Sequence, residues 1–151
     1  MRRIVAFVFL LGVSLLILIG VASPKVQYDG LEKVCFVTSG EVDFQDEKVL
    51  TSGNQSYVTV DAARADEIRK QLAQIDGYIL YFSPKTSVES LLEQFFDYKN
   101  PSYLLAGYTI YDGYTSKYFD FCMLNGRKYN VQLAVTPEAI IVGFPMILTG
   151  F

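Results

Sequence analysis

Hydrophobic and polar positions divide the chain into one long apolar run near the N-terminus and a remainder of short alternating segments. No charged residue occurs from Ile4 to Ala22, and Arg2 and Arg3 precede this run. Basic residues followed by an apolar stretch are typical of an export signal, while the length of the run is close to the roughly 20 residues that span a bilayer. The pattern predicts a signal peptide or membrane anchor at residues 1–23, with cleavage left open. The positive-inside tendency then places the rest of the chain outside the cytoplasm.

After a polar tether at residues 24–33, short apolar runs indicate strands. The runs at residues 34–37, 57–60 and 78–82 are rich in β-branched and aromatic residues, and the last is bounded by Gly and Pro. They predict three strands, of which residues 78–82 form a buried central one. The polar stretch from Gln45 to Gln55 predicts a surface hairpin or loop.

Two helices are expected among these strands. Asp61 can cap the first helix, which ends at Asp76-Gly77 and has apolar residues at spacings of three and four. These apolar residues are Ala65, Ile68, Leu72 and Ile75. The second helix begins at the capping-box pattern Thr86-Ser87-Val88-Glu89 and ends before Asn100-Pro101. Its apolar stripe consists of Val88, Leu91, Leu92, Phe95 and Phe96.

From Tyr103 onward the pattern predicts strands and turns, with a hairpin around Asn125-Gly126. A two-residue loop would divide the apolar residues of its strands between two faces. A three-residue loop, Leu124-Asn125-Gly126 with a left-handed Gly126, places them all on one face, opposite to Cys122. These apolar residues are Phe119, Phe121, Met123, Tyr129, Val131, Leu133 and Val135. We therefore expect all of them to contribute to the core.

The elements add up to one α+β domain at residues 34–151. In this domain an antiparallel sheet carries two helices packed on one face. The length of the chain suits a single core of modest size.

The charge of the chain argues against one class of partner. The chain contains 13 basic and 16 acidic residues, and without Arg2 and Arg3 the exported part carries about −5. Nucleic-acid binding depends on Lys and Arg that neutralise phosphates. Because no basic cluster is present either, we expect no nucleic-acid partner.

The sequence offers little catalytic or metal-binding chemistry. The chain contains no His, which excludes Ser-His and Cys-His nucleophile pairs and His-containing zinc sites. Asp43, Asp46 and Glu47 come nearest to a carboxylate cation site, but they lack the spacing of a calcium loop, so a solvated loop is expected. No catalytic, cofactor-binding or metal-binding residue is predicted. The alternative is a carbohydrate-active enzyme that uses two carboxylates distant in sequence.

A group of tyrosines is the candidate binding surface. The tyrosines that crowd this region are Tyr103, Tyr108, Tyr111, Tyr114, Tyr118 and Tyr129. Of these, Tyr108, Tyr111 and Tyr114, together with Asp112, could form a surface that binds a sugar or a peptide. The alternative is structural, because strands favour tyrosine, which buries its ring and keeps its hydroxyl hydrated.

Two cysteines, Cys35 and Cys122, are present. Outside the cytoplasm they could form a disulfide. The alternative is a pair of buried free thiols.

The last third of the chain resembles the YwmB family. The resemblance lies in residues 107–147 and rests on Gly107-Tyr108-Thr109, on residues 125–135 and on residues 140–147, with Phe144 as a departure. Members of that family are exported proteins of Gram-positive spore formers whose function is not established. The resemblance implies an α+β fold similar to the TATA-box-binding protein, which is a structural label, and it assigns no functional residue.

These observations favour a non-enzymatic accessory module at the cell envelope. Residues 4–22 would contact the membrane, and the domain would bind a protein or cell-wall partner on the outer side of the cytoplasmic membrane or after secretion. No cofactor is expected.

Overall fold

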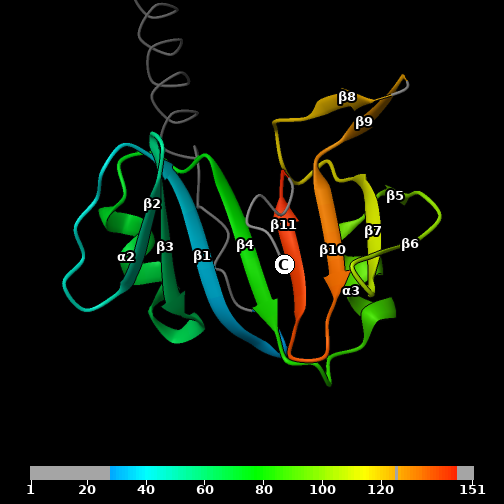
Figure 1. The fold of residues 1–151 in the computed structure, drawn as a ribbon, viewed down its shortest axis with the longest axis horizontal. Coiled ribbons are helices and arrows are strands. Elements are labelled where there is room, and N and C mark those ends of the chain that lie inside the picture. The colour runs from blue at the N-terminus through cyan, green and yellow to red at the C-terminus, as the bar shows by residue number, and fades with distance from the viewer. Residues whose placement is uncertain (1–27, 125, 146–151) are drawn as a thin grey trace, which may run out of the picture.

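The computed structural model describes residues 28–124 and 126–145, and most of their strands form one large sheet (Figure 1). The strands of the N-terminal half are β1 (Leu31–Ser39), β2 (Lys48–Ser52), β3 (Gln55–Asp61) and β4 (Gly77–Phe82). Those of the C-terminal half are β5 (Tyr98–Lys99), β6 (Tyr103–Leu105), β7 (Tyr108–Tyr114), β10 (Val131–Val135) and β11 (Ile140–Phe144). The order across the sheet is β2-β3-β1-β4-β11-β10-β7-β5, and β6 also pairs with β7.

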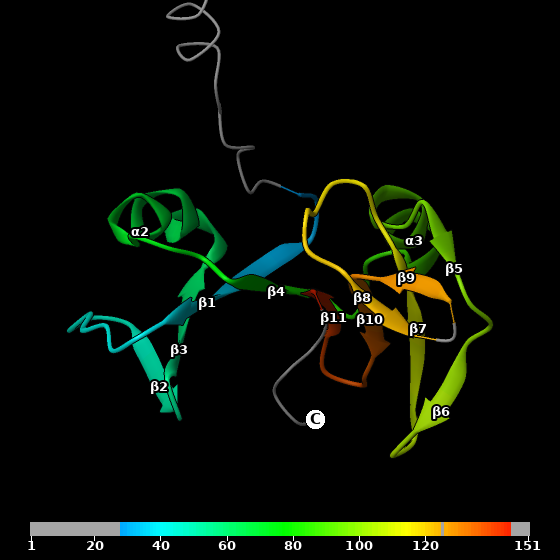
Figure 2. The ribbon, with the colours of Figure 1, turned by 90° about the horizontal axis from the view of Figure 1, so that it is seen from above.

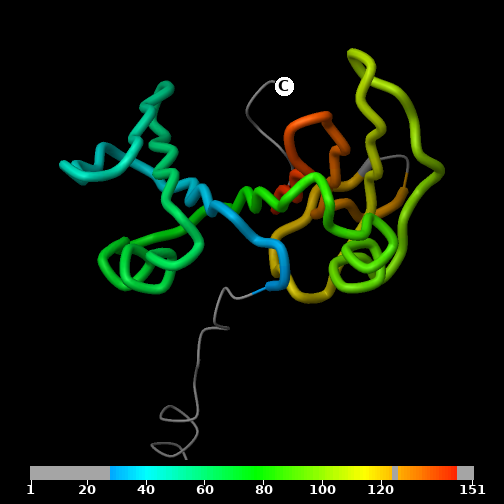
Figure 3. The backbone as a smooth tube through the Cα atoms, turned by 90° about the horizontal axis from the view of Figure 1, so that it is seen from below, coloured from blue at the N-terminus to red at the C-terminus, as the bar shows by residue number. Residues whose placement is uncertain are grey.

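Every strand pair of this sheet is antiparallel in the described part of the chain. The predicted strands at residues 34–37, 57–60 and 78–82 lie within β1, β3 and β4, and β4 is central, between β1 and β11. The path in Figure 3 places the strands up to β4 in one half of the sheet and those after α3 in the other. The predicted polar hairpin is β2–β3, in which Ser52 pairs with Gln55.

Two α-helices, α2 (Ala65–Gln71) and α3 (Val88–Phe95), cover the same face of the sheet (Figure 2). The core between helices and sheet includes Ala65 and Ile68 of α2, Leu91 and Phe95 of α3, and the inward residues of β1, β3, β4, β10 and β11. A smaller cluster around Cys35, Val37, Tyr57 and Ile79 lies on the opposite face, which we call the helix-free face. The α+β prediction, with an antiparallel sheet and two helices on one face, is confirmed for the described residues.

Helix α2 is shorter than predicted. It follows a 3-10 turn, η1 (Ala62–Arg64), the side chain of Asp61 makes no capping bond, and the helix ends at Gln71. The backbone is extended at Leu72, and beyond it the Thr38 hydroxyl of β1 donates to the carbonyl oxygen of Gln74 at 2.7 Å, which holds this segment against the sheet. The last two apolar positions of the predicted stripe, Leu72 and Ile75, still pack against the core, but outside the helix.

Helix α3 begins one residue later than the capping-box pattern placed it. The side chain of Ser87, and not that of Thr86, accepts a hydrogen bond from the backbone N–H of Ser90 at 3.2 Å. The Ser87 hydroxyl also donates to Glu89 at 3.2 Å. The helix ends at Phe95, so β5 separates it from the predicted stop at Asn100-Pro101.

The hairpin prediction was wrong. Strands β8 (Cys122–Leu124) and β9 (Arg127–Tyr129) form a separate two-stranded sheet in which Leu124 pairs directly with Arg127, so the loop has two residues. Gly126 does have a positive φ, of 75°. Three of the apolar residues assigned to the core are exposed: Phe119, Phe121 and Met123.

The error has a physical reason: the chain does not continue as one ladder from the hairpin into the main sheet. It changes sheets at the buried Asn130, and only β10 joins the large sheet. Val131 and Leu133 are therefore in the core as expected. Tyr129 pairs directly with Cys122, so these two residues share a face of the hairpin, whereas the prediction had placed them on opposite faces.

The two cysteines do not form a disulfide in the structure. Cys35 is a buried free thiol in β1, and Cys122 is an exposed free thiol in β8. Burial raises the pKa of the Cys35 thiol, while a hydrogen bond with Thr59 and the charge of Lys48 lower it.

The predicted membrane segment, residues 4–22, lies outside the described residues. Within residues 28–124 and 126–145, no helix has the length and apolarity needed to cross a bilayer.

Candidate functional site

The four predicted surface residues all lie on β7, but the sheet brings only three of them together. In an antiparallel sheet, directly paired residues share a face and alternate residues lie on opposite faces. Tyr111 pairs with Leu133 and packs against the helix-side core. Tyr108, Asp112 and Tyr114 alternate with it and lie on the helix-free face.

Three residues from neighbouring strands join them. Tyr98 of β5 pairs with Tyr114, Tyr103 of β6 pairs with Ile110, and Gln132 of β10 pairs with Asp112, so all three lie on the helix-free face. We call this set the tyrosine surface. It consists of Tyr98, Tyr103, Tyr108, Asp112, Tyr114 and Gln132.

The centre of the tyrosine surface is a polar group held in place by hydrogen bonds. The Gln132 amide, whose residue is only 8% exposed, donates from Nε2 to Asp112 Oδ1 at 2.9 Å. Burial raises the pKa of Tyr103, and hydrogen bonding to Asp112 and the charge of Asp112 raise it further, while Gln132 lowers it. The Tyr103 hydroxyl thus lies within reach of both side chains and stays protonated as a donor at neutral pH.

An aromatic stack borders this polar centre. The rings of Tyr98 and Tyr114 stack with centroids 5.7 Å apart and an interplanar angle of 23°. The Lys128 ammonium of β9 lies 5.8 Å from the centroid of the Tyr114 ring and 4.3 Å from that of Phe121. The Tyr98 hydroxyl donates to the backbone carbonyl of Lys128. These contacts fix the β8–β9 hairpin against the edge formed by β5 and β7.

Several apolar side chains of the C-terminal half are exposed. Phe119 is 96% exposed and Met123 is 59% exposed, and Tyr103 of the tyrosine surface is 41% exposed. Because Tyr103 combines an exposed ring with the polar pair beside it, the β7 edge of the sheet is the candidate for contact with a partner.

Sequence reasoning missed Tyr98 and Gln132, and it named Tyr103 in the wider group of tyrosines without placing it beside Asp112. Two of these residues become neighbours of β7 only because the short strands β5 and β6 fold back onto its outer edge. Strand alternation alone could have placed Tyr108, Asp112 and Tyr114 on one face and Tyr111 on the other. It could not have identified the pairing partners.

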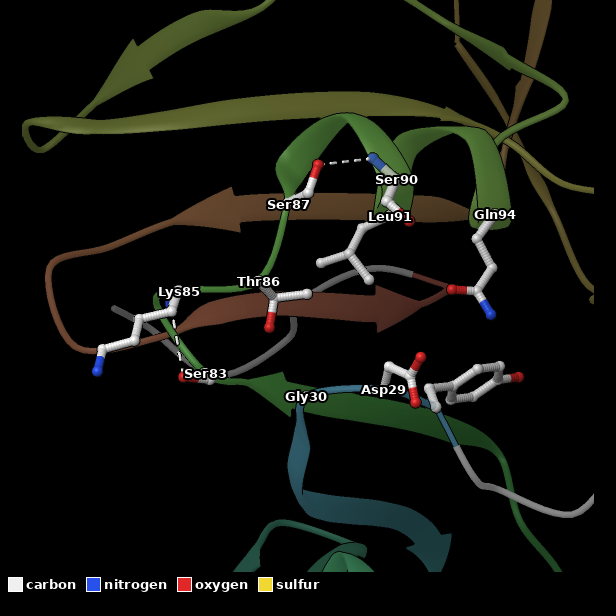
Figure 4. Close-up of a pocket in the computed structure, with 10 residues that line it drawn as sticks. Asp29, Gly30, Ser83, Lys85, Thr86, Ser87, Ser90, Leu91 and Gln94 are labelled. Carbon is white, nitrogen blue, oxygen red and sulfur yellow. Dashed lines mark hydrogen bonds between the residues drawn. The ribbon is translucent and has the colours of Figure 1, made fainter.

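A second candidate is a cleft of about 670 Å³ on the helix side (Figure 4). It is lined by Tyr28, Asp29, Gly30, Ser83, Lys85, Thr86, Ser87, Ser90, Leu91 and Gln94. Gly30 approaches Thr86 so closely that a Cβ on Gly30 would lie 2.3 Å from the Thr86 hydroxyl oxygen, and its φ is +78°. This contact joins the start of β1 to the start of α3.

The cleft contains hydroxyl groups but no visible catalytic arrangement. Ser87 is engaged with the N-terminus of α3, and the Lys85 side chain points away from Ser87 and Ser90 (Figure 4). Asp29 is the one carboxylate of the cleft.

The carboxylates that came nearest to a cation site in the sequence do not gather in the structure. Glu47 forms a salt bridge with Arg64, and the described residues include no cluster of three metal-ligating side chains.

Comparisons of the chain with protein-family models, curated proteins and solved structures found no match.

Proposed function

We propose that this protein is an exported or membrane-anchored, non-enzymatic accessory module that binds a protein or cell-wall partner at the cell envelope. The tyrosine surface is the binding face. The observation that carries this proposal is the grouping of half-exposed tyrosines around a hydrogen-bonded Asp112–Gln132 pair on the helix-free face.

The position of Tyr28 supports an outward orientation of this surface. Tyr28 packs edge-on against Phe95 of α3, with ring centroids 5.0 Å apart, and also contacts Phe82. The chain therefore enters the described region on the helix side. Tyr28 is six positions after Ala22, which corresponds to a span of about 20 Å at most, so an anchor ending at Ala22 would hold the helix side near the bilayer. The tyrosine surface would then face away from it.

We also propose that the chain is related to the YwmB family and has a fold like that of the TATA-box-binding protein. Supporting this, the β2–β3 hairpin at one end of the sheet and β6, with the adjoining part of β7, at the other extend away from the helices in Figure 2. The proposal carries no nucleic-acid function, because the acidic balance of the exported part opposes phosphate binding.

A carboxylate-pair enzyme is less well supported. Such a mechanism needs two acids about 5–10 Å apart. The cleft has Asp29 alone and the tyrosine surface has Asp112 alone. Asp112 is also tied to Gln132, which suits a binding role.

Photo-crosslinking on intact cells tests the proposal. A photoreactive phenylalanine analogue is placed at position 108 on the tyrosine surface, and in a control at position 93, where Glu93 is exposed on α3. We expect a discrete crosslinked product, retained in the envelope fraction, from position 108 only. Products from position 93 alone would place the binding face on the helix side and contradict the proposal.

A further inference from the structure

We propose that the tyrosine surface binds the pyranose rings of a linear, uncharged glycan. This inference rests on the proposed function, because it names the ligand class of the same surface. It follows from the hydrogen-bonding groups at the centre, the rings beside them and the charge around them.

The centre of the surface offers both acceptors and donors in fixed positions. A carboxylate accepts hydrogen bonds only, whereas an amide and a phenol both donate and accept. Gln132 is almost fully buried and orients the Asp112 carboxylate through the 2.9 Å bond. Adjacent hydroxyl groups on a sugar ring present donors and acceptors side by side, so they match this centre. Because the carboxylate is already held, little conformational freedom is lost on binding.

The rings at the border suit the apolar face of a pyranose. A sugar ring has a face of C–H groups that packs on an aromatic ring, and its hydroxyl groups point outward to the polar centre. The Tyr103 and Tyr98 rings are both partly exposed. Tyr98 is held by its stack on Tyr114 and by its bond to Lys128, so it presents a rigid platform.

The charge and the length of the tyrosine surface narrow the class of ligand further. Asp112 forms no salt bridge with a described lysine or arginine, so its negative charge disfavours phosphate-rich ligands. From Tyr108 to Tyr114 the strand covers about 20 Å. That length suits several linked sugars in a row better than a single sugar.

Titration of the full chain in detergent with the tetramer of β-1,4-linked N-acetylglucosamine tests this inference. Because the chain has 11 Tyr and no Trp, tyrosine fluorescence reports binding directly. The variants are Tyr103→Ala and Asp112→Asn, and the matched control is Leu104→Ala. Leu104 is adjacent to Tyr103 and 75% exposed, but it points to the other side of β6. Circular dichroism checks that each variant is folded.

We expect saturable binding that weakens at least about tenfold in Tyr103→Ala and Asp112→Asn and changes less than about twofold in Leu104→Ala. No saturation by about 10 mM tetramer would overturn the glycan assignment. A crosslinked partner at position 108 would in that case leave the proposed function standing, whereas the absence of both signals would remove both. Equal losses in Leu104→Ala and Tyr103→Ala would also overturn the assignment, because the ligand would not lie on the tyrosine surface.

Discussion

At the scale of single residues, Asn130 determines how the C-terminal half is folded. Its side chain is fully buried, and Oδ1 accepts from the backbone N–H of Thr115 at 2.7 Å. Its Nδ2 donates to the carbonyl oxygens of Thr115 at 2.8 Å and of Tyr118 at 2.9 Å. One amide thus ties the loop after β7 to the point where the chain leaves the hairpin and enters β10.

Asn130→Asp should destabilise the protein strongly. The carboxylate cannot donate, so the carbonyl oxygens of Thr115 and Tyr118 lose their partner and a charge is buried. We expect the free energy of unfolding to fall by about 3 kcal/mol at pH 7. Urea unfolding measures it, with Asn54→Asp in the exposed β2–β3 turn as the control. Equal stability of the two variants would contradict the account of Asn130.

Tyr118 is the second residue that joins distant parts of the chain. Its hydroxyl donates to the carbonyl oxygen of Asp76 at 2.5 Å, and its ring packs on Phe144. Burial, together with the smaller effects of the charges of Asp120, Tyr78 and Asp76, raises the pKa of Tyr118 from 10.0 to about 12. The folded protein therefore favours the neutral phenol.

This pKa predicts a loss of stability in alkali. A group whose pKa is raised on folding stabilises the fold fully below its unfolded pKa, and the contribution is lost as the pH rises through the folded pKa. For Tyr118 this window is from about pH 10 to about pH 12. Between these pH values, the free energy of unfolding measured with denaturant should decrease less steeply with pH in Tyr118→Phe than in the parent. Identical slopes of free energy against pH would show that Tyr118 is not the group responsible.

At the scale of elements, the β8–β9 hairpin contributes little to the core. Met123 of this hairpin is exposed, whereas Leu133 of β10 is completely buried. Met123→Ser should change the free energy of unfolding by no more than about 0.5 kcal/mol. Leu133→Ala should reduce it by about 2–5 kcal/mol. Thermal unfolding of both variants distinguishes this arrangement from a hairpin that is continuous with the core, for which both changes would be costly.

Local patterns predicted most elements because each depends on nearby residues. Strands β1, β3 and β4, the helix stripe of α3 and the polar β2–β3 hairpin all follow from periodicity and turn residues. The short α2 does not, because the segment that follows its end at Gln71 is bound by Thr38, distant in sequence, through the carbonyl oxygen of Gln74. The hairpin register failed for a related reason, since Asn130 separates two sheets that the alternation pattern treats as one.

The candidate site could be predicted only in part for the same reason. Tyr108, Asp112 and Tyr114 share a face through the alternation of one strand. Tyr98, Tyr103 and Gln132 join them through pairings between strands, and no local pattern specifies those pairings.

At the scale of the whole molecule, the two faces of the sheet carry different features. The helix side holds the main core and the point where the chain enters from its N-terminal segment. The helix-free face holds the tyrosine surface at its β7 end. Under the proposed function, this division would leave the tyrosine surface accessible to a partner.

The export proposal makes a prediction about topology. Because Arg2 and Arg3 precede the apolar run, a reporter fused after Phe151 should be active only if it needs the environment outside the cytoplasm. An alkaline phosphatase fusion and a green fluorescent protein fusion form a matched pair for this measurement. Fluorescence without phosphatase activity would overturn the proposed location.

The tyrosine surface as the binding face is the central claim, and hydrogen–deuterium exchange tests it most directly. The full chain in detergent is compared with and without isolated cell envelopes. We predict slower exchange at residues 98–114 and 128–132, with no change in α2 and α3. Protection confined to residues 28–30 and 83–94, around the helix-side cleft, would contradict the claim.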